Sequence, residues 1–458
     1  MPLILGTNSI KDTGFNVANS LRFNSGSSDY LTKSNGSGST TKATISVWVK
    51  HTFGSSEDIF QSFNNSENAF RLRFRDTGEI ELTTFISDST ILDKRTTAVF
   101  RDPSAWMHIC VIINLSDGTA EDKVQLYVNG SRVTSFVVNT NTSATSGAWV
   151  GGSSDFGFTI GRNPANSNYY NGYMSEFVFI DNNNLSADQF GEFDSDSGIW
   201  KPIDVSGLTF GTNGFYLDFE NSGSLGADVS GNGNNFTVNN LTAIDQSTDT
   251  CTNNFATWNP LKSWNRSGTI QTASFDNGNL RAIFDDANYN EHAWSTIGIN
   301  TGKWFCEMKA EDITATSNTR IGIADIEYTG TANPGDQSST IYYMGNGQKR
   351  VGGTNSSYGA SYTNGDIIGI ALDCDNDTVT FYKNGASQGV LSSTNGILYA
   401  FISEDFQSSG NKEIQANFGS PPYSESGGNS DGNGYGNFSM AVPSNHFSLN
   451  TKNLAEYG

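Results

Sequence analysis

Charged residues are scarce in this sequence, and so are the patterns that predict helices. Asp, Glu, Lys and Arg together make up 16% of the 458 residues, and no stretch repeats with the 3.6-residue period of an amphipathic helix. No apolar run reaches the roughly 18 residues of a membrane-spanning helix. The run from Pro2 to Leu5 follows no basic segment and is too short for a signal peptide. We therefore expect no helical fold, no membrane span and no signal peptide.

Histidine and cysteine, the usual zinc ligands, number only four each. They are Cys110, Cys251, Cys306, Cys374, His51, His108, His292 and His446. No two cysteines form a CxxC pair, and no spacing suits zinc. Cys110 and Cys306 lie in apolar, strand-like runs, where cysteine behaves as a small core residue. We expect His108 to be structural rather than a general base, and we assign no metal or other cofactor to these residues.

Acidic residues dominate the charge. There are 47 Asp and Glu against 26 Lys and Arg, which gives a net charge of −21 at pH 7. A chain of this sign repels nucleic acid and anionic membranes, and no stripe of basic residues offsets the repulsion. The sequence therefore predicts partners that are neither nucleic acids nor membranes.

Aromatic residues and glycine, by contrast, are abundant, with 30 Phe, 17 Tyr and 49 Gly. Phe and Tyr favour strands, and Gly and Asn supply the turns between them. Apolar and polar residues alternate along 43–49, 70–74 and 124–128, which places Arg71 and Arg73 on a solvent-facing side. Many short strands without helices predict an all-β fold built of sandwiches.

One hairpin pattern occurs in both halves of the chain. Residues 124–130 (VQLYVNG) and 379–385 (VTFYKNG) each run from a strand into Asn-Gly, the preferred two-residue hairpin turn. Each follows a more apolar strand and an acidic turn, so the repetition favours two domains of related topology. The expected organisation is an N-terminal arm over 1–19, a sandwich over 20–203, a Gly- and Asn-rich linker over 204–255, and a second sandwich with a Gly-rich C-terminal tail over 256–458.

Several motifs resemble two known families. SVWVK, LYVNG, FTIGR and NGYMSEFVFID, in this order, resemble the laminin-G-like (concanavalin A-like lectin/glucanase) domain over about residues 20–203. GKWFCEMK, TRIGIAD and TVTFYKNG resemble a SPRY domain over about residues 256–420. Both families are two-sheet, jelly-roll-like sandwiches, so the resemblance implies two concanavalin-like β-sandwich domains joined by the linker.

The pairing of these domains resembles structural proteins of tailed phages, marine ones in particular. Two segments resemble that group in sequence: the start, MPLILGTNSIKDTGFNVANSLRFN, and the end, LNTKNLAEYG. The resemblance implies a location on the virion surface as a head decoration or a tail or fibre-associated protein. It also implies other virion proteins as partners, a homo-oligomer, and contact with a host surface glycan. A free lectin-like adhesin is the alternative within the binding class.

A glycoside hydrolase of the same fold is the alternative from another class. Laminarinase-type glucanases carry Glu-x-Asp-x-Glu on one strand, and Glu192-Phe-Asp194-Ser-Asp196 comes near this pattern. However, the third acid is Asp, and in the laminin-G-like pattern the segment follows a short helical turn. The G-x-S-x-G sequence at 428–432 lies in a glycine-rich loop, without the strand and helix of a nucleophile elbow. We therefore expect no catalytic residues and no enzymatic activity.

Tyrosines near loops are the candidate ligand-binding residues, because tyrosine offers a sugar ring both an apolar face and a polar tip. They are Tyr169, Tyr170, Tyr173, Tyr342, Tyr343, Tyr358 and Tyr362. The last four fall where SPRY domains commonly meet ligands. The competing interpretation is that these rings cap the ends of the sandwiches.

Two further features are candidates for binding. Asp373, Asp375 and Asp377 offer the hard oxygen ligands that calcium prefers, although a solvated hairpin turn is the favoured interpretation. Leu3, Ile4 and Leu5 form a small apolar patch in the N-terminal arm, which we expect to attach the protein to its virion partners. Packing of the arm on its own sandwich is the alternative.

Overall fold

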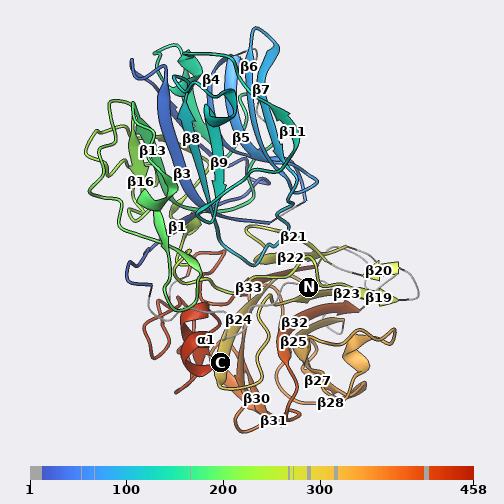
Figure 1. Cartoon of the computed structure of the whole chain (residues 1–458). Helices are drawn as coiled ribbons and strands as arrows, with labels where there is room; N and C mark the ends of the chain where they lie inside the picture. The colour runs from blue at the N-terminus through green and yellow to red at the C-terminus, as the bar shows by residue number, and fades with distance from the viewer. Residues whose placement is uncertain are drawn as a thin grey trace. The chain divides into compact units, whose positions relative to one another are not determined.

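The computed structural model describes residues 13–52, 54–65, 68–165, 167–266, 269–271, 273–285, 290–313, 318–406, 412–425 and 427–458. Among these, Thr13–Thr252 form one compact unit and Asn253–Gly458 a second. Both are built almost entirely of antiparallel strands (Figure 1), so the predicted all-β fold is confirmed. No described helix is long and apolar enough to cross a membrane.

The first unit contains two eight-stranded sheets. One runs in the order β10-β9-β8-β3-β13-β1-β18, with β16 also paired to β13. Its strands are β1 (Ser20–Phe23), β3 (Lys42–His51), β8 (Met107–Asn114), β9 (Val124–Val128), β10 (Ser131–Arg132), β13 (Gly172–Asp181), β16 (Phe215–Leu217) and β18 (Gln246–Ser247).

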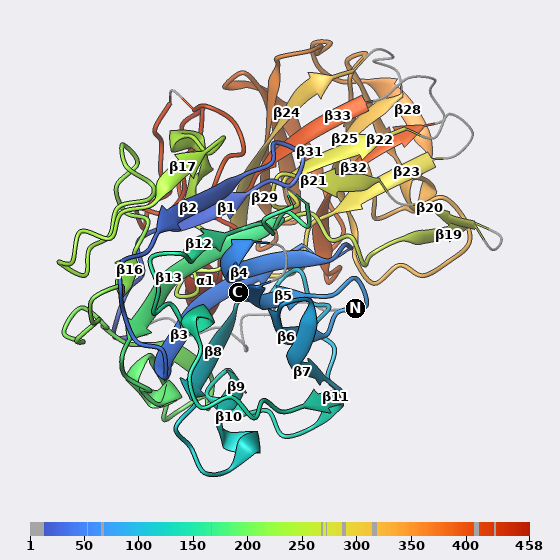
Figure 2. The ribbon, with the colours of Figure 1, turned by 90° about the horizontal axis from the view of Figure 1, so that it is seen from above.

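The other sheet runs in the order β11-β7-β6-β5-β4-β12-β2-β17. Its strands are β2 (Tyr30–Ser34), β4 (Glu57–Asn65), β5 (Asn68–Phe74), β6 (Ile80–Ile86), β7 (Ser89–Thr96), β11 (Phe136–Thr140), β12 (Gly157–Ile160) and β17 (Thr237–Asn239). In Figure 2, β4 to β7 follow one another and lead to β11. A separate hairpin joins β14 (Gly191–Phe193) to β15 (Trp200–Pro202), and short 3-10 helices lie at η2 (Ala120–Asp122), η3 (Ala148–Val150), η4 (Ala187–Gln189) and η5 (Ala243–Asp245).

The core of the first unit lies between its two sheets. Alternation sends Ile45 and Val47 of β3 inward to meet Phe70 and Leu72 of β5, and all four are buried. A group of phenylalanines fills the centre: the ring centroids of Phe158 and Phe179 lie 4.7 Å apart, in a tilted arrangement. Burial of these rings supplies much of the stability of a sandwich.

A third layer covers the outer face of the β3–β8–β13 sheet. Val178 and Ile180 of β13 point away from the central core and pack against Phe190, Phe210 and Tyr216. All ten residues of β13 are consequently buried. Because both faces of such a strand are buried, its sequence need not alternate between polar and apolar residues.

The segment expected to be a linker, 204–255, belongs almost entirely to the first sandwich. Strand β16 pairs with β13, β17 with β2, and β18 with β1. Phe215, Leu217 and Phe236 lie in the central core. The linker prediction is therefore wrong for 204–252, because the few apolar residues of this glycine-rich stretch complete the core. The boundary between the units falls between Thr252 and Asn253.

Part of the predicted N-terminal arm also packs on the first sandwich. The backbone N–H of Val17 donates to Thr252 Oγ1 at 3.1 Å, and Val17 is buried. The carbonyl of Asn19 accepts a hydrogen bond from the side chain of Ser175 at 3.3 Å. Leu3, Ile4 and Leu5, the predicted attachment residues, lie outside the described residues.

The second unit is again made of two large sheets, with the orders β21-β22-β33-β24-β29-β30-β31, where β34 also pairs with β24, and β23-β32-β25-β26-β27-β28. The strands of the first are β21 (Ser274–Asp276), β22 (Arg281–Phe284), β24 (Lys303–Asp312), β29 (Ile367–Asp373), β30 (Thr378–Lys383), β31 (Ala386–Ser392), β33 (Lys412–Asn417) and β34 (Phe447–Ser448). Those of the second are β23 (Asn290–Trp294), β25 (Thr319–Asp325), β26 (Ile341–Met344), β27 (Gln348–Val351), β28 (Thr354–Ser357) and β32 (Tyr399–Phe406). A hairpin of β19 (Trp264–Arg266) and β20 (Thr269–Gln271), the 3-10 helix η6 (Pro334–Asp336) and the helix α1 (Thr451–Tyr457) complete the unit.

The repeated hairpin is present in both units. Asn129 and Gly130 link β9 to β10 with φ values of 46° and 72°, and Asn384 and Gly385 link β30 to β31 with φ values of 49° and 84°. Positive φ at both central residues defines the type I′ turn, whose twist matches that of the flanking strands. The hairpin prediction is therefore confirmed in both copies.

Candidate functional site

Five of the seven candidate tyrosines are buried in the described structure. They are Tyr170, Tyr173, Tyr342, Tyr343 and Tyr362, none more than 1% exposed. Tyr343 and Tyr362 pack edge to face with centroids 5.1 Å apart, and the hydroxyl of Tyr362 donates to the carbonyl of Tyr343 at 3.1 Å. A ring inside the core offers no face to a sugar, so the prediction is wrong for these five residues.

Tyr169 and Tyr358 are partly exposed, and they belong to different units. The Tyr169 ring lies 6.3 Å from that of Tyr30, which in turn lies 3.6 Å from the guanidinium of Arg162. The hydroxyl of Tyr358 donates to the carbonyl of Gly389 on β31. A ligand-binding role for these two tyrosines stays a prediction.

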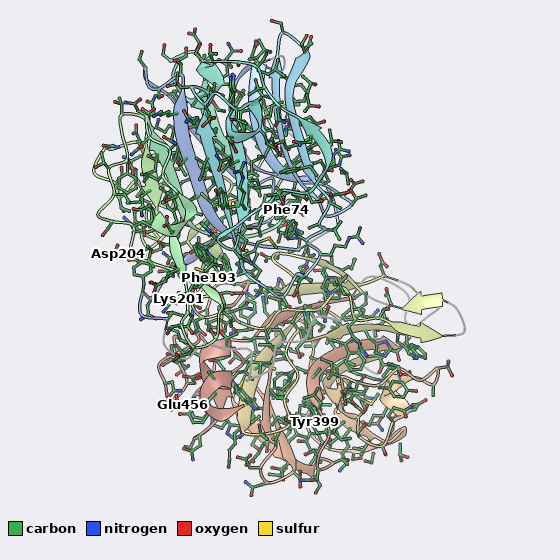
Figure 3. All side chains as sticks on the ribbon, in the orientation of Figure 1. Phe74, Phe193, Lys201, Asp204, Tyr399 and Glu456 are labelled. Carbon is green, nitrogen blue, oxygen red and sulfur yellow. The ribbon has the colours of Figure 1, made fainter. Side chains whose placement is uncertain are left out.

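The acidic motif at 192–196 does not form one face of a strand. Strand β14 ends at Phe193, and Asp194 closes the turn that follows by accepting hydrogen bonds from the backbone N–H groups of Asp196 and Ser197. These bonds hold the pKa of Asp194 at about 2. Lys201 on β15 lies 3.4 Å from both Glu192 and Asp194. Figure 3 shows Phe193 and Lys201 on this hairpin, and its geometry accounts for the acids as turn-forming residues.

The candidate calcium ligands also bind within the protein. Asp373 pairs with Lys303 at 2.8 Å, Asp375 accepts from the backbone N–H of Gly302 at 2.8 Å, and Asp377 accepts from the side chain of Asn395 at 3.2 Å. Across the described part of the chain, no group of three or more His, Cys, Asp and Glu side chains is arranged to hold a metal ion. The acidic turn therefore behaves as a hydrogen-bonded hairpin loop.

His108 is a structural residue, as predicted. Its Nε2 lies 2.8 Å from Ser46 Oγ, and its Nδ1 accepts a hydrogen bond from the indole of Trp200 at 3.2 Å. Burial lowers the pKa of His108 to about 3, so the ring is neutral at physiological pH. It connects β8 to the β14–β15 hairpin.

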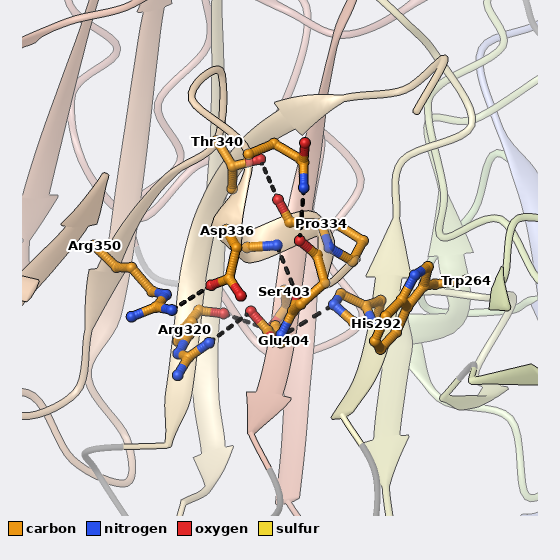
Figure 4. Close-up of polar contacts among 12 residues, drawn as sticks. Trp264, His292, Arg320, Pro334, Asp336, Thr340, Arg350, Ser403 and Glu404 are labelled. Atoms are coloured by element: carbon orange, nitrogen blue, oxygen red, sulfur yellow. Dashed lines mark hydrogen bonds and ion pairs between the residues drawn. The ribbon is translucent and has the colours of Figure 1, made fainter. Parts of the chain in front are cut away.

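A buried charge cluster spans strands β23, β32 and β25 at one side of the second unit's smaller sheet (Figure 4). Glu404 on β32 accepts hydrogen bonds from Arg320 Nη1 at 3.1 Å and Asn333 Nδ2 at 3.0 Å, and His292 Nε2 lies 3.6 Å away. Burial raises the pKa of Glu404, but Arg320, His292 and Asn333 outweigh that effect and hold it at about 2.

This cluster anchors a loop rather than opening a site. Glu404 and His292 are completely buried. A Cβ at Gly335 would stand 2.8 Å from the Glu404 carboxylate and 3.0 Å from the Tyr342 ring, so the loop that carries η6 lies directly on the cluster. Sequence periodicity could not reveal this network, because its members come from four separate segments.

An open cavity, which we call the rim pocket, lies at one end of the first sandwich. It measures about 470 Å³, within the usual range of ligand pockets. Its lining residues are Asn64, Asn68, Ile86, Ile91, Ala144, Ser146, Gly147, Ala148, Trp149 and Phe156. They come from the β4–β5 and β6–β7 hairpin ends, from η3 with the loop before it, and from the residue preceding β12.

Packing shapes the floor of this rim pocket. The Trp149 ring stacks on that of Phe70 with centroids 5.8 Å apart and planes inclined by 16°. A Cβ at Gly147 would come within 2.1 Å of the Trp149 indole, so glycine is needed for the loop to close over the ring. The backbone N–H of Ser87 donates to Asn68 Oδ1 at 3.1 Å, which ties the two hairpin ends together.

The described lining of the rim pocket is neutral. None of the ten lining residues carries a charge, although the chain as a whole has a net charge of −21. Two amide side chains and one hydroxyl provide hydrogen-bond donors and acceptors, and the two isoleucines and two aromatic rings provide apolar surface. Sequence analysis missed this site, because hairpin ends far apart in the sequence build it.

Two family models match the chain. Residues 25–189 match the concanavalin A-like lectin/glucanases superfamily, and residues 303–421 match the SPRY domain. The chain therefore contains both domains in the predicted order.

Individual relatives match parts of the chain. The E3 ubiquitin-protein ligase RKP of Arabidopsis thaliana is 28% identical over 110 residues, which are 24% of this chain and 8% of that protein. The chain thus spans less than a tenth of this curated relative. The SPRY domain of human HERC1 matches with a TM-score of 0.28 and 18% identity, over 31% of this chain and 91% of that one. A heptameric SAP-like pentraxin from Limulus polyphemus matches with a TM-score of 0.28 and 14% identity, over 38% and 80% of the two chains.

Proposed function

We propose that this chain, which joins a concanavalin A-like domain to a SPRY domain, is a non-catalytic carbohydrate-binding protein displayed on the surface of a tailed-phage virion. The neutral rim pocket of the first sandwich is the observation that carries the carbohydrate part of the proposal. The resemblance of the chain's two ends to phage structural proteins supports the virion part. Detection of the chain in purified virions by protein mass spectrometry tests that assignment.

The lining of the rim pocket suits a neutral saccharide. A sugar ring has apolar C–H faces bordered by hydroxyl groups that donate and accept hydrogen bonds. Ile86 and Ile91 offer apolar surface to such faces, while Asn64 and Ser146 are exposed and available for the hydroxyl groups. A charged ligand would find no counter-ion among the lining residues.

Two other functions make different predictions. A free lectin-like adhesin would bind the same sugars but would be absent from purified virions. A glycoside hydrolase would release reducing ends from a polysaccharide, and the activity would disappear in Glu192→Gln. The exposed position of Glu192 on the β14–β15 hairpin favours the binding function over hydrolysis.

Glycan-array screening of the full chain, followed by calorimetric titration of the best ligand, tests the proposal. Asn64→Ala should weaken binding roughly tenfold, because one hydrogen-bonding amide is lost from the pocket. Ser146→Trp should abolish binding by filling the pocket from its exposed side. Asn139→Ala is the matched control, because this exposed amide lies on β11 of the same sheet and is not among the residues that line the pocket. Unchanged affinity in both pocket variants would reject the rim pocket as the glycan site.

A further inference from the structure

Four arginines gather on one part of this acidic chain. Arg71 and Arg73 lie on β5, Arg75 follows that strand directly, and Arg95 lies on β7. They represent four of the 26 basic residues in a chain with 47 acidic ones. Such a concentration of positive charge is unexpected on a protein with a net charge of −21.

Strand register places these residues on a single face. Glu81 of β6 pairs with Arg73 of β5 on one side and with Arg95 of β7 on the other. Two residues further along the strands, Arg71 pairs with Thr83. The intervening residues of β5, which include Leu72, point into the core. Because side chains alternate along a strand, the arginines therefore occupy the face opposite the core.

Glu81 forms the centre of this arginine face. Arg73 donates to one of its carboxylate oxygens, and Arg75 and Arg95 each lie 3.1 Å from the other. Burial raises the pKa of Glu81, but the hydrogen bond from Arg73 and the charges of the three arginines outweigh burial and hold it below its usual value. Asp93 of β7 also lies 3.9 Å from Arg95, so two carboxylates face three guanidinium groups here and one positive charge is in excess.

Two arginines are the most exposed partners in these ion pairs. The side chains of Arg75 and Arg95 are each 27% exposed, whereas that of Glu81 is 2% exposed. Asp58, the partner of Arg71 at 3.3 Å, is completely buried. A ligand therefore meets these two guanidinium groups above the Glu81 carboxylate, with Asp93, which is 21% exposed, beside Arg95.

Hydrogen-bonding capacity also remains unused on this face. Among the described residues, Arg95 Nε, Thr83 Oγ1 and Asp93 Oδ1 are buried polar atoms without a hydrogen-bond partner. The ring of Phe85, also on β6, lies 5.7 Å from the Arg71 guanidinium. Partly exposed guanidinium groups with an aromatic ring nearby are suited to a carboxylated or sulfated sugar.

We propose that the arginine face is a second binding surface, which takes an acidic polysaccharide. The planar guanidinium group matches carboxylate and sulfate geometry and binds such groups through paired hydrogen bonds. Nucleic acid is a poorer occupant, because its dense charge would extend over a chain that is acidic elsewhere. An acidic saccharide carries its charges farther apart and interposes hydroxyl groups.

The arginine face is independent of the rim pocket. Along β5, Arg71 and Arg73 lie three and five residues from the pocket residue Asn68, which corresponds to about 10 and 17 Å at the rise of a strand. The rim pocket is uncharged and the arginine face is cationic, so their ligands differ in charge. Failure of neutral sugars to bind would leave this proposal intact. Failure of acidic polysaccharides to bind would likewise leave the rim-pocket proposal intact.

Binding of the full chain to heparin, alginate and neutral dextran tests the proposal. Heparin carries sulfates and alginate carries carboxylates alone, so these two polymers distinguish the acidic groups. We expect at least one to bind at about 0.05 M salt and to be released at about 0.5 M, because screening weakens exposed charge pairs. Arg75→Gln and Arg95→Gln should each weaken that binding about tenfold. Arg75→Lys should retain part of it, because the charge remains while the planar donor group is lost.

Arg132→Gln is the matched control, because Arg132 lies on β10 of the other sheet of the same unit, is exposed and is paired with Asp122. Its affinity for the acidic polymers should equal that of the unmodified chain. Thermal unfolding of each variant establishes that the first unit is folded. Equal binding by a folded Arg75→Gln/Arg95→Gln double variant would overturn the proposal. So would an absence of binding to both acidic polymers, or tighter binding to duplex DNA or polyglutamate.

Discussion

Glu176 combines three unusual features at a single position. It has a φ of 49°, which non-glycine residues rarely adopt, at the point where the pairing of β13 with β3 shifts register between Ser175 and Val178. It is buried, and it accepts a hydrogen bond from the hydroxyl of Tyr216 at 2.6 Å. Burial raises the pKa of Glu176 to about 8, so the protonated form is favoured in the folded protein.

The raised pKa of Glu176 makes the stability of the first unit depend on pH. The folded-state pKa of about 8 lies above the ordinary value of 4.5. The folded chain therefore binds a proton more tightly than the unfolded chain, and this contribution to stability is complete below about pH 4.5. It is lost as the pH rises toward 8. Glu176→Gln retains an acceptor for Tyr216 without ionising, so we expect a higher Tm than the unmodified chain at pH 8 and little difference at pH 5.

Calorimetric scans from pH 4.5 to pH 9 measure this difference. Asp155→Asn is the control, because Asp155 is an exposed acid of the same unit. Its scans should keep the pH dependence of the unmodified chain. An unchanged pH dependence in Glu176→Gln would show that Glu176 does not titrate in this range.

The burial of individual tyrosines shows that strand alternation alone does not predict whether a side chain is exposed. Tyr173 alternates along β13 like a residue of a half-exposed strand, yet it is buried because both faces of β13 are covered. Alternation identifies the two faces of a strand but not whether another layer covers the outer one. By contrast, the prediction for His108 was confirmed, because its place in an apolar strand already indicated burial.

At the scale of elements, the segment 204–252 shows how composition can mislead. Its richness in Gly and Asn is typical of linkers, but here amide and carboxylate side chains bind the backbone between the segment's short strands. Asn232 and Asn234 both donate to the carbonyl of Gly214, at 2.9 and 2.8 Å. Asp228 accepts from the backbone N–H groups of Tyr216 and Asn234 at 3.0 and 2.7 Å. These bonds hold the aromatic residues of the segment in the core.

Phe215→Ala in the full chain tests the structural role of this segment. Phe215 is completely buried, and its ring packs against that of Phe236 with centroids 4.7 Å apart. Truncation should lower the free energy of unfolding of the first unit by about 3–5 kcal/mol, the usual loss for a buried phenylalanine. Urea unfolding measures the change, with Val229→Ala as a control because Val229 in the same segment is 48% exposed. A loss below about 0.5 kcal/mol, typical of surface substitutions, would restore the linker interpretation.

At the scale of the whole molecule, local and global features were predictable to different degrees. The two type I′ hairpins and the two sandwich domains follow from short-range signals, since Asn-Gly turns and strand alternation are local. Net charge is a sum over the whole chain, so it gives no indication of a local cluster such as the arginine face. Arg71 and Arg73 were correctly predicted to point away from the core, but their approach to Arg95 depends on a pairing across β6 that the sequence does not show.

The proposed place of the molecule on a virion leads to a last prediction, about its N-terminal arm. Leu3, Ile4 and Leu5 lie outside the described residues, and they form an apolar patch too small to fold alone. Docked on a partner, each side chain would contribute about 1.5–3 kcal/mol, and an oligomer would multiply the effect. Replacing all three with Ser should therefore leave both units folded while depleting the protein from purified virions, as measured by quantitative mass spectrometry. Replacing Thr7, Asn8 and Ser9 with Ala is the control, because these neighbours are polar and incorporation should stay normal. Full incorporation of the serine variant would mean that attachment depends on a surface of the folded units instead.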